Sequence, residues 1–143
     1  MKSTMLIVAI SLFIFGCANT MAGGQDSGPT MTRDTSAGEV LTTPSGMTLY
    51  TYDKDQHNTS NCTGSCAQNW PPFTAQAGDQ ASDDFGTIKR KDGSMQWTYE
   101  GKPLYTFVGD KAAGDVKGNG IGGVWHVVPA EDDYQEGSYG GSY

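Results

Sequence analysis

The chain has 143 residues, and its 9 Lys and Arg are outnumbered by 16 Asp and Glu, which gives a formal net charge of −7 at pH 7. This charge argues against binding to nucleic acid, whose phosphates require a basic surface, and it disfavours direct docking on anionic lipid. The length suits a single domain.

Residues 1–16 have the features of an export signal. Lys2 supplies a positive charge, and an apolar run interrupted only by Ser11 extends from Met5 to Phe15. The run is too short to cross a bilayer, because a membrane-spanning helix needs about 20 apolar residues.

The run ends at Gly16-Cys17, which resembles the lipobox of bacterial lipoproteins, where the cysteine is acylated and becomes the mature N-terminus. The resemblance implies that the protein reaches a membrane through acyl chains on Cys17, since each buried methylene contributes about 0.8 kcal/mol. In enteric lipoproteins, an Asp directly after the acylated cysteine retains the protein at the inner membrane. This chain has Ala18 at that position, which by analogy implies the outer membrane. An ordinary secretory signal with an incidental cysteine is the alternative.

Gly, Ser, Thr and Asp dominate the next segment, and no apolar period appears in it, so residues 17–38 are predicted to be a flexible tether. Residues 131–143 are acidic and then rich in Gly, Ser and Tyr, which predicts a disordered tail. The folded domain is therefore expected over residues 39–130. A core of this size benefits from a crosslink.

Turn residues divide this domain into short strands. The Pro and Gly of Thr43-Pro44-Ser45-Gly46 suit a type I turn between strands at 40–43 and 47–52. Asp92-Gly93 is a hairpin signal between strands at 86–90 and 95–99, and the flanking Lys89-Arg90-Lys91 is assigned to the solvated end of that hairpin.

Two more strands are predicted at 104–108 and 124–128, and no helical period of useful length appears outside the signal. The pattern indicates an all-β fold: a single small domain of about six to eight short strands.

One stretch of the domain recurs at a fixed offset. Gly46–Asp55 is echoed by Gly101–Asp110, and the same offset carries Trp70 onto Trp125. An unbroken register of this kind indicates one structural unit used twice. We therefore predict two pseudo-equivalent halves, at about 40–73 and 95–128, that share one core.

Both copies carry the pattern Tyr-x-aromatic-x-x-Asp, as Tyr50, Tyr52 and Asp55 in the first and Tyr105, Phe107 and Asp110 in the second. The pattern is similar to that of the predicted bacterial lipoproteins named for the Yx(F/W/Y)xxD motif, a secreted repeat family of unknown function. The resemblance spans about residues 39–129 and includes the two cysteines followed by Trp70-Pro71-Pro72. It implies an exported β-rich repeat and brings no established activity, cofactor or substrate.

Two interpretations of the repeated motif are open. In the first, the rings pack the core and each Asp caps a turn through backbone N–H groups. In the second, rings and carboxylates line a ligand groove, made of Tyr50, Tyr52, Asp55, Trp70, Tyr105, Phe107, Asp110 and Trp125. We favour the first, because both halves need such a joint in order to fold.

Cys62 and Cys66 remain once Cys17 is assigned to lipid, and an exported protein meets an oxidising compartment, so a disulfide is predicted. The loop that it closes is small, and its stabilisation is about 2 kcal/mol. A thioredoxin-like couple has two residues between its cysteines and lies at a helix N-terminus. Three residues separate this pair, and no helix is predicted beside it.

Metal sites have weak support in the sequence. Asp115-x-Lys117-x-Asn119-Gly120 partly resembles a calcium loop, but Lys117 and His126 stand where oxygen ligands belong. His57 and His126 are the only histidines and lack zinc-site spacing, so no cofactor is expected. The sequence therefore favours a non-enzymatic, acyl-anchored envelope protein that acts as a binding or structural module. The alternative is an envelope redox or metal-handling protein that uses Cys62 and Cys66.

Overall fold

The computed structural model describes residues 28–82 and 84–130. The predicted export signal, the acidic tail and residues 17–27 of the predicted tether, Cys17 included, lie outside the described residues. The described residues contain no helix of the length and apolarity that a membrane crossing requires.

Short strands dominate the described part of the chain, which confirms the all-β prediction. The elements in chain order are β1 (Met31–Thr35), β2 (Gly38–Thr42), β3 (Tyr50–Tyr52), α1 (Ser65–Asn69), β4 (Phe85–Lys89), β5 (Met95–Tyr99), β6 (Lys102–Pro103), the 3₁₀ turn η1 (Ile121–Gly123) and β7 (Trp125–Val127).

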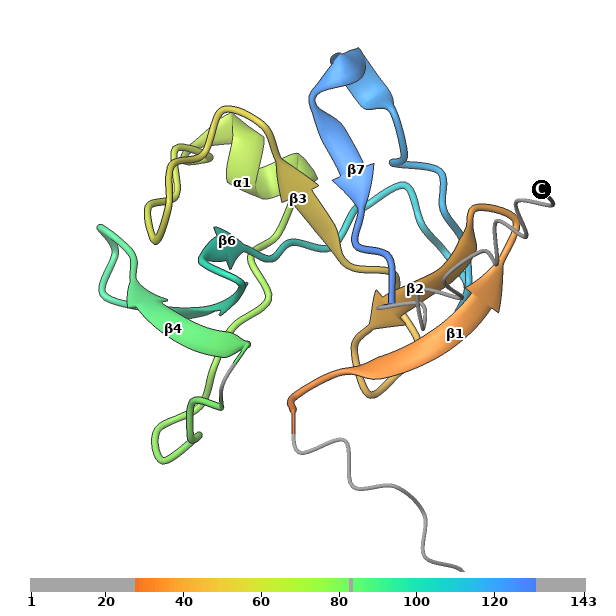
Figure 1. The fold of residues 1–143 in the computed structure, drawn as a ribbon. Coiled ribbons are helices and arrows are strands. Elements are labelled where there is room, and N and C mark those ends of the chain that lie inside the picture. Colours follow the sequence, from red (N-terminus) through yellow and green to blue (C-terminus); the bar gives the residue numbers. More distant parts are fainter. Residues whose placement is uncertain (1–27, 83, 131–143) are drawn as a thin grey trace, which may run out of the picture.

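The strands form three small antiparallel sheets, in the orders β1-β2, β3-β7 and β4-β5-β6. Figure 1 shows the orange β1–β2 hairpin and the green β4 on opposite sides of the molecule, with β3 and β7 between them. The middle sheet joins a strand of the first half to the last strand of the second, with Tyr50 opposite Val127 and Tyr52 opposite Trp125.

β1 corrects the predicted tether, whose C-terminal part is a strand paired with β2 from Met31↔Thr42 to Thr35↔Gly38. The first four side chains of β1 are exposed, and the fifth is only partly buried. An edge strand of this kind is held by its backbone hydrogen bonds and shows no alternation of apolar residues. The sequence pattern therefore misses it.

Both predicted turns are present. Gly46 N–H donates to Thr43 O at 2.8 Å, and Thr43 N–H donates to Met47 O at 2.8 Å. At Asp92-Gly93 the turn is closed by Arg90 N–H, which donates to Ser94 O at 2.8 Å, and β4 and β5 lie within one residue of their predicted bounds.

The strand predicted at 104–108 is wrong in its extent. β6 covers Lys102–Pro103, and beyond it Tyr105 forms isolated bridges with Tyr50 and Pro72. This segment runs beside Pro71-Pro72, which lack backbone N–H groups and cannot continue a ladder. Beyond Tyr105, single backbone bonds from Thr106 N–H to Pro71 O at 2.9 Å and from Val108 N–H to Asn69 O at 3.1 Å hold the two segments together without forming a strand.

The two halves are related by reciprocal contacts, as in a two-fold symmetric interface. Tyr50 N–H donates to Tyr105 O at 2.8 Å, and Tyr105 N–H donates to Tyr50 O at 3.0 Å. Val128 N–H of the second half donates to Leu49 O of the first at 3.1 Å. At the equivalent positions, Phe73 N–H of the first half donates to Leu104 O of the second at 2.9 Å. The halves thus bind each other through the same backbone positions.

The core consists of two clusters of buried residues. One contains Leu41, Leu49, Trp97, Tyr99, Leu104, Val128 and Ala130. The other contains Tyr50, Cys62, Trp70, Tyr105 and Trp125. Because each cluster draws on both halves, the predicted shared core is confirmed.

Candidate functional site

The motif aromatics form a stack of four rings at the junction of the halves. Trp70 and Trp125 lie face to face in the middle, with centroids 3.8 Å apart and planes at 3°. The Tyr52 ring stacks on Trp125 and the Phe107 ring stacks on Trp70, each with ring centroids 4.3 Å apart. Since each outer ring belongs to the half opposite the indole that it covers, the stack alternates between the halves.

The first tyrosine of each motif packs edge-on against this stack. The ring centroids of Tyr50 and Trp70 are 5.3 Å apart, with an angle of 78° between the ring planes. The centroids of Tyr105 and Trp125 are 5.2 Å apart, with an angle of 90°. Both tyrosines have no exposed surface, and both indoles are about 95 % buried. These four rings therefore lie in the core, and only Tyr52 and Phe107 at the ends of the stack are partly exposed.

Each of these tyrosines binds the motif aspartate of the other half. Tyr50 OH donates to Asp110 Oδ2 at 2.7 Å, and Tyr105 OH donates to Asp55 Oδ2 at 2.6 Å. The second oxygen of each carboxylate accepts from the backbone of its own loop: Asn61 N–H at 2.6 Å for Asp55, and Lys117 N–H at 2.9 Å for Asp110. The turn-capping role expected for the Asp is present, whereas the bond from each Asp to the tyrosine of the other half was not predicted from the sequence.

Burial sets the protonation of these phenols. It raises the pKa of Tyr50 and of Tyr105 far above the ordinary value, and the bond to a carboxylate raises each pKa further. Burial also raises the pKa of Asp55, against the bonds from Tyr105 and Asn61 and the charge of Arg90. The tyrosines are therefore permanent neutral donors, which suits a structural joint and not proton transfer at neutral pH.

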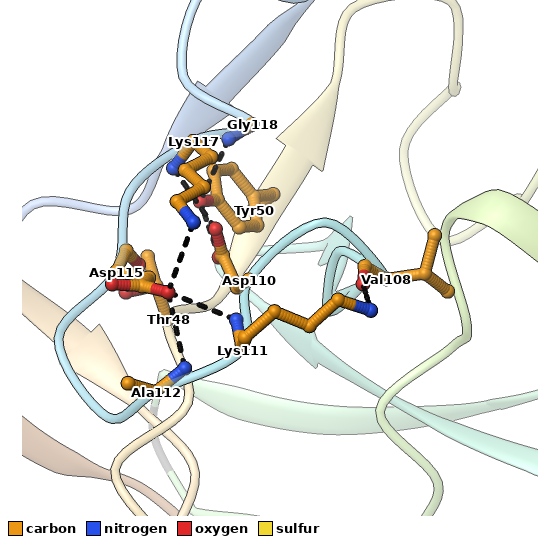
Figure 2. A network of polar contacts seen from close by, with 9 residues as sticks. All are labelled: Thr48, Tyr50, Val108, Asp110, Lys111, Ala112, Asp115, Lys117 and Gly118. Atoms are coloured by element: carbon orange, nitrogen blue, oxygen red, sulfur yellow. Dashed lines mark hydrogen bonds and ion pairs between the residues drawn. The ribbon is translucent and has the colours of Figure 1, made fainter.

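The loop of the second half wraps around the Tyr50 hydroxyl, as Figure 2 shows. Gly118 N–H donates to this hydroxyl at 3.2 Å. Gly118 is buried, and a Cβ on it would lie 2.7 Å from the Trp70 ring and 2.9 Å from Tyr50. Glycine is thus required here for close approach to the stack.

The same loop contains the segment that partly resembles a calcium loop. Asp115 Oδ2 accepts from Lys111 N–H at 2.9 Å and from Ala112 N–H at 3.0 Å, and it lies 3.7 Å from Lys117 Nζ. These two backbone bonds lower the pKa of Asp115. Figure 2 shows this carboxylate directed at its own loop, and Asp115 O accepts from Thr48 Oγ1 at 2.6 Å.

The loop of the first half is closed by the predicted disulfide, which is confirmed between Cys62 and Cys66, with Cα atoms 5.2 Å apart. Cys62 has no exposed surface and packs in the cluster that holds Trp70. Cys66 lies in α1, a helix of five residues that the sequence analysis did not predict, since little more than one turn leaves no detectable period.

A buried arginine replaces the solvated hairpin end that the sequence analysis expected at this position. Arg90 is only 9 % exposed. Its Nη1 donates to Ser60 Oγ at 2.8 Å and to Gln96 Oε1 at 2.7 Å, and its Nη2 donates to Cys62 O at 2.7 Å. Arg90 directly follows the last residue of β4, and its buried side chain stands between two exposed lysines.

Ser60 connects this arginine to the motif. Its hydroxyl lies 2.7 Å from Tyr105 OH, which itself donates to Asp55, so Ser60 donates to Tyr105 and accepts from Arg90. Gln96 Nε2 continues the network to Leu104 O at 2.8 Å. Gln96 gave no signal in the sequence, because it alternates with Met95, Trp97 and Tyr99 and is a polar residue on the opposite face of the predicted strand.

The two histidines have different neighbours. His126 Nε2 and Asp53 Oδ2 are 2.8 Å apart at the surface, and His57 lies against Gly101. Within residues 28–82 and 84–130, no three His, Cys, Asp or Glu side chains gather closely enough to hold a metal ion.

Two shallow hollows open on the surface of the first-half loop. One, of about 290 Å³, is lined by Tyr52, Asp55, His57 and Glu100 among others. The other, of about 190 Å³, lies between residues 58–63 and residues 88–91.

The model of a family described as a secreted repeat of unknown function matches residues 31–74 and again residues 86–129. The two matches begin at β1 and in β4, so each repeat is longer than the predicted 40–73 and 95–128 and includes the hairpin before the turn. No curated protein and no solved structure matches the chain.

Proposed function

The chain belongs to the secreted repeats of unknown function, and from this we propose that it is a non-enzymatic binding or structural module of the bacterial cell envelope, anchored by acyl chains on Cys17. The reciprocal bonding of the motif is the observation that supports a non-enzymatic role. Asp110 is 5 % exposed, and both motif carboxylates and both phenols are satisfied within the fold. Groups held in this way join the halves and are not available to a substrate.

The anchor has its support in the sequence. Gly16-Cys17 follows an apolar run of signal length, and the exported location of the family agrees with it. The residues between Cys17 and β1 would reach at most about 45 Å when fully extended. The folded body would thus stay close to the bilayer, at the outer membrane if Ala18 directs sorting as it does in enteric lipoproteins.

Expression of the full chain in a Gram-negative host tests the anchor. With labelled palmitate, we expect label on the wild-type chain and its recovery with membranes, whereas Cys17→Ser removes the label and releases the protein. Ala18→Asp is the matched variant, and it should keep the label while moving the protein to the inner-membrane fraction. An unlabelled wild-type chain, or label retained by Cys17→Ser, would refute the anchor.

The non-enzymatic role is tested separately on the released Cys17→Ser chain. We expect it not to reduce insulin with dithiothreitol beyond the uncatalysed rate, because Cys62 is fully buried. Catalytic reduction that Cys62→Ala/Cys66→Ala abolishes would favour the envelope redox alternative instead.

A further inference from the structure

Arg90 is a buried cation whose direct partners are all neutral. Its two terminal nitrogens bind a hydroxyl, an amide oxygen and a backbone carbonyl. Its charge acts on two carboxylates as a minor influence: burial raises the pKa of Asp55 in spite of it, and the bonds from Ser94 lower the pKa of Asp92 more than it does. Neither carboxylate forms an ion pair with it in the described part of the chain. A buried charge without a directly bonded counter-ion is unfavourable unless another anion binds it.

One N–H donor of the guanidinium also has no acceptor. Arg90 Nε is buried and has no hydrogen-bond partner among the described residues. Buried N–H groups are nearly always paired in folded proteins, so the groups around Arg90 do not fully satisfy this cationic side chain.

A hollow of about 190 Å³ lies beside Arg90. It is lined by residues 88–91 and by Asn58, Thr59, Ser60 and Thr63. One water occupies about 30 Å³ of the liquid, so the hollow holds an ion of phosphate size with several waters. The side chains of Lys89, Lys91 and Thr63 make no hydrogen bond or ion pair to other described residues.

We infer that this hollow is a binding site for a small oxyanion of the phosphate or sulfate class, held by Arg90, Lys89 and Lys91 and by the hydroxyl and amide groups of the 58–63 loop. The planar guanidinium and ammonium donors match tetrahedral oxyanions. The positive charge is local: three of the chain's 9 basic residues line this hollow, while the net charge of the chain is −7. That overall charge favours a free ion over an anionic membrane, which would repel the rest of the protein.

The test uses the full-length Cys17→Ser chain and inorganic phosphate as the probe, at constant ionic strength with sodium chloride as the balancing salt. ¹H–¹⁵N spectra are recorded for the backbone amides and for the Arg90 Nε–H. We expect saturable shifts of Arg90 Nε–H and of the amides of residues 58–63. Lys89→Ala/Lys91→Ala, both exposed positions, should weaken the affinity about tenfold.

Lys102→Ala is the matched control, because it removes an exposed cation from the other hollow and should leave the affinity unchanged. Shifts that grow linearly without saturation, or that the double lysine variant leaves unaltered, would overturn the inference. Sedimentation with phosphatidylglycerol vesicles, combined with no response to phosphate, would also overturn it and assign the site to lipid headgroups.

Discussion

The indoles of Trp70 and Trp125 lie face to face, with centroids 3.8 Å apart and planes only 3° from parallel. They occupy the same position in the two repeats, so the repeats meet through identical residues at the centre of the fold. The stacked contacts of Tyr52 and Phe107 and the edge-on contacts of Tyr50 and Tyr105 with this pair each occur twice, once from each half. Substitutions at equivalent positions are therefore expected to have comparable effects, and differences between them measure how far the halves have diverged.

Trp70→Ala and Trp125→Ala should each lower the free energy of unfolding by about 3–5 kcal/mol, because each leaves a large cavity in the four-ring stack. Urea denaturation followed by circular dichroism measures the loss. Ile121→Ala serves as the control, since this side chain is 39 % exposed and should change stability by less than about 0.5 kcal/mol. A loss at only one of the two indoles would contradict the reciprocal arrangement.

Tyr50→Phe should destabilise the protein by about 1–3 kcal/mol, because it leaves the Asp110 carboxylate buried without its phenol donor. Tyr105→Phe should cost less, since its partner Asp55 is partly exposed and water can replace the lost donor. Chemical denaturation of both variants tests this order. Tyr52→Phe is the matched control and should be nearly neutral, because the hydroxyl of Tyr52 has no bond in the described structure.

Asp115 should make the free energy of unfolding decrease as the pH falls into the acid range. Its pKa is lower in the folded chain than its ordinary value of about 3.9, chiefly through the backbone N–H groups of Lys111 and Ala112. The stabilisation is therefore present above pH 4 and is lost as pH falls through the lowered pKa. Urea midpoints of the wild type and Asp115→Asn should differ at pH 6 and converge near pH 2. A constant difference would contradict this assignment.

Asp55 should act in the opposite direction, because burial raises its pKa in the folded state. Its contribution to stability is greatest below pH 4, where it is protonated in both states, and is lost as pH rises through the raised pKa. Asp55→Asn should therefore show a steeper loss of stability on acidification than the wild type. The same urea series tests this, and a shallower loss would refute it.

Reduction of the disulfide should lower stability by about 2 kcal/mol, the value expected for a very small loop. The effect should extend to Arg90, whose Nη2 donates to Cys62 O. Thermal denaturation with and without dithiothreitol measures the loss, and the Arg90 side-chain resonances show whether the guanidinium is released. Cys62→Ala/Cys66→Ala should not respond to dithiothreitol, and a response there would show that the reductant acts elsewhere.

The repeat made much of this fold predictable from sequence. The shared register of Tyr50 with Tyr105 and of Trp70 with Trp125 predicted two like halves and a common aromatic core. A register states which residues are equivalent but not which residues touch. The bonds from Tyr50 to Asp110 and from Tyr105 to Asp55 were therefore missed, although all four residues were singled out.

Two further misses have local causes. β1 is an exposed edge strand whose stabilisation comes from the backbone of β2, so its side chains give no signal. Arg90 stands between two exposed lysines in a turn, where charge alone indicates solvent, and its partners Ser60, Gln96 and Cys62 are distant or unremarkable in sequence.

The pairing of β3 with β7 places the last strand of the second repeat beside the third strand of the first, and both core clusters draw on both copies, so neither copy has a core of its own. A chain with a single copy would have no folding partner except a second such chain, and the same reciprocal bonds would close a homodimer. Fusion into one polypeptide removes the dependence on concentration. It also frees the two copies to diverge, and one loop now holds a cystine where the other relies on glycine.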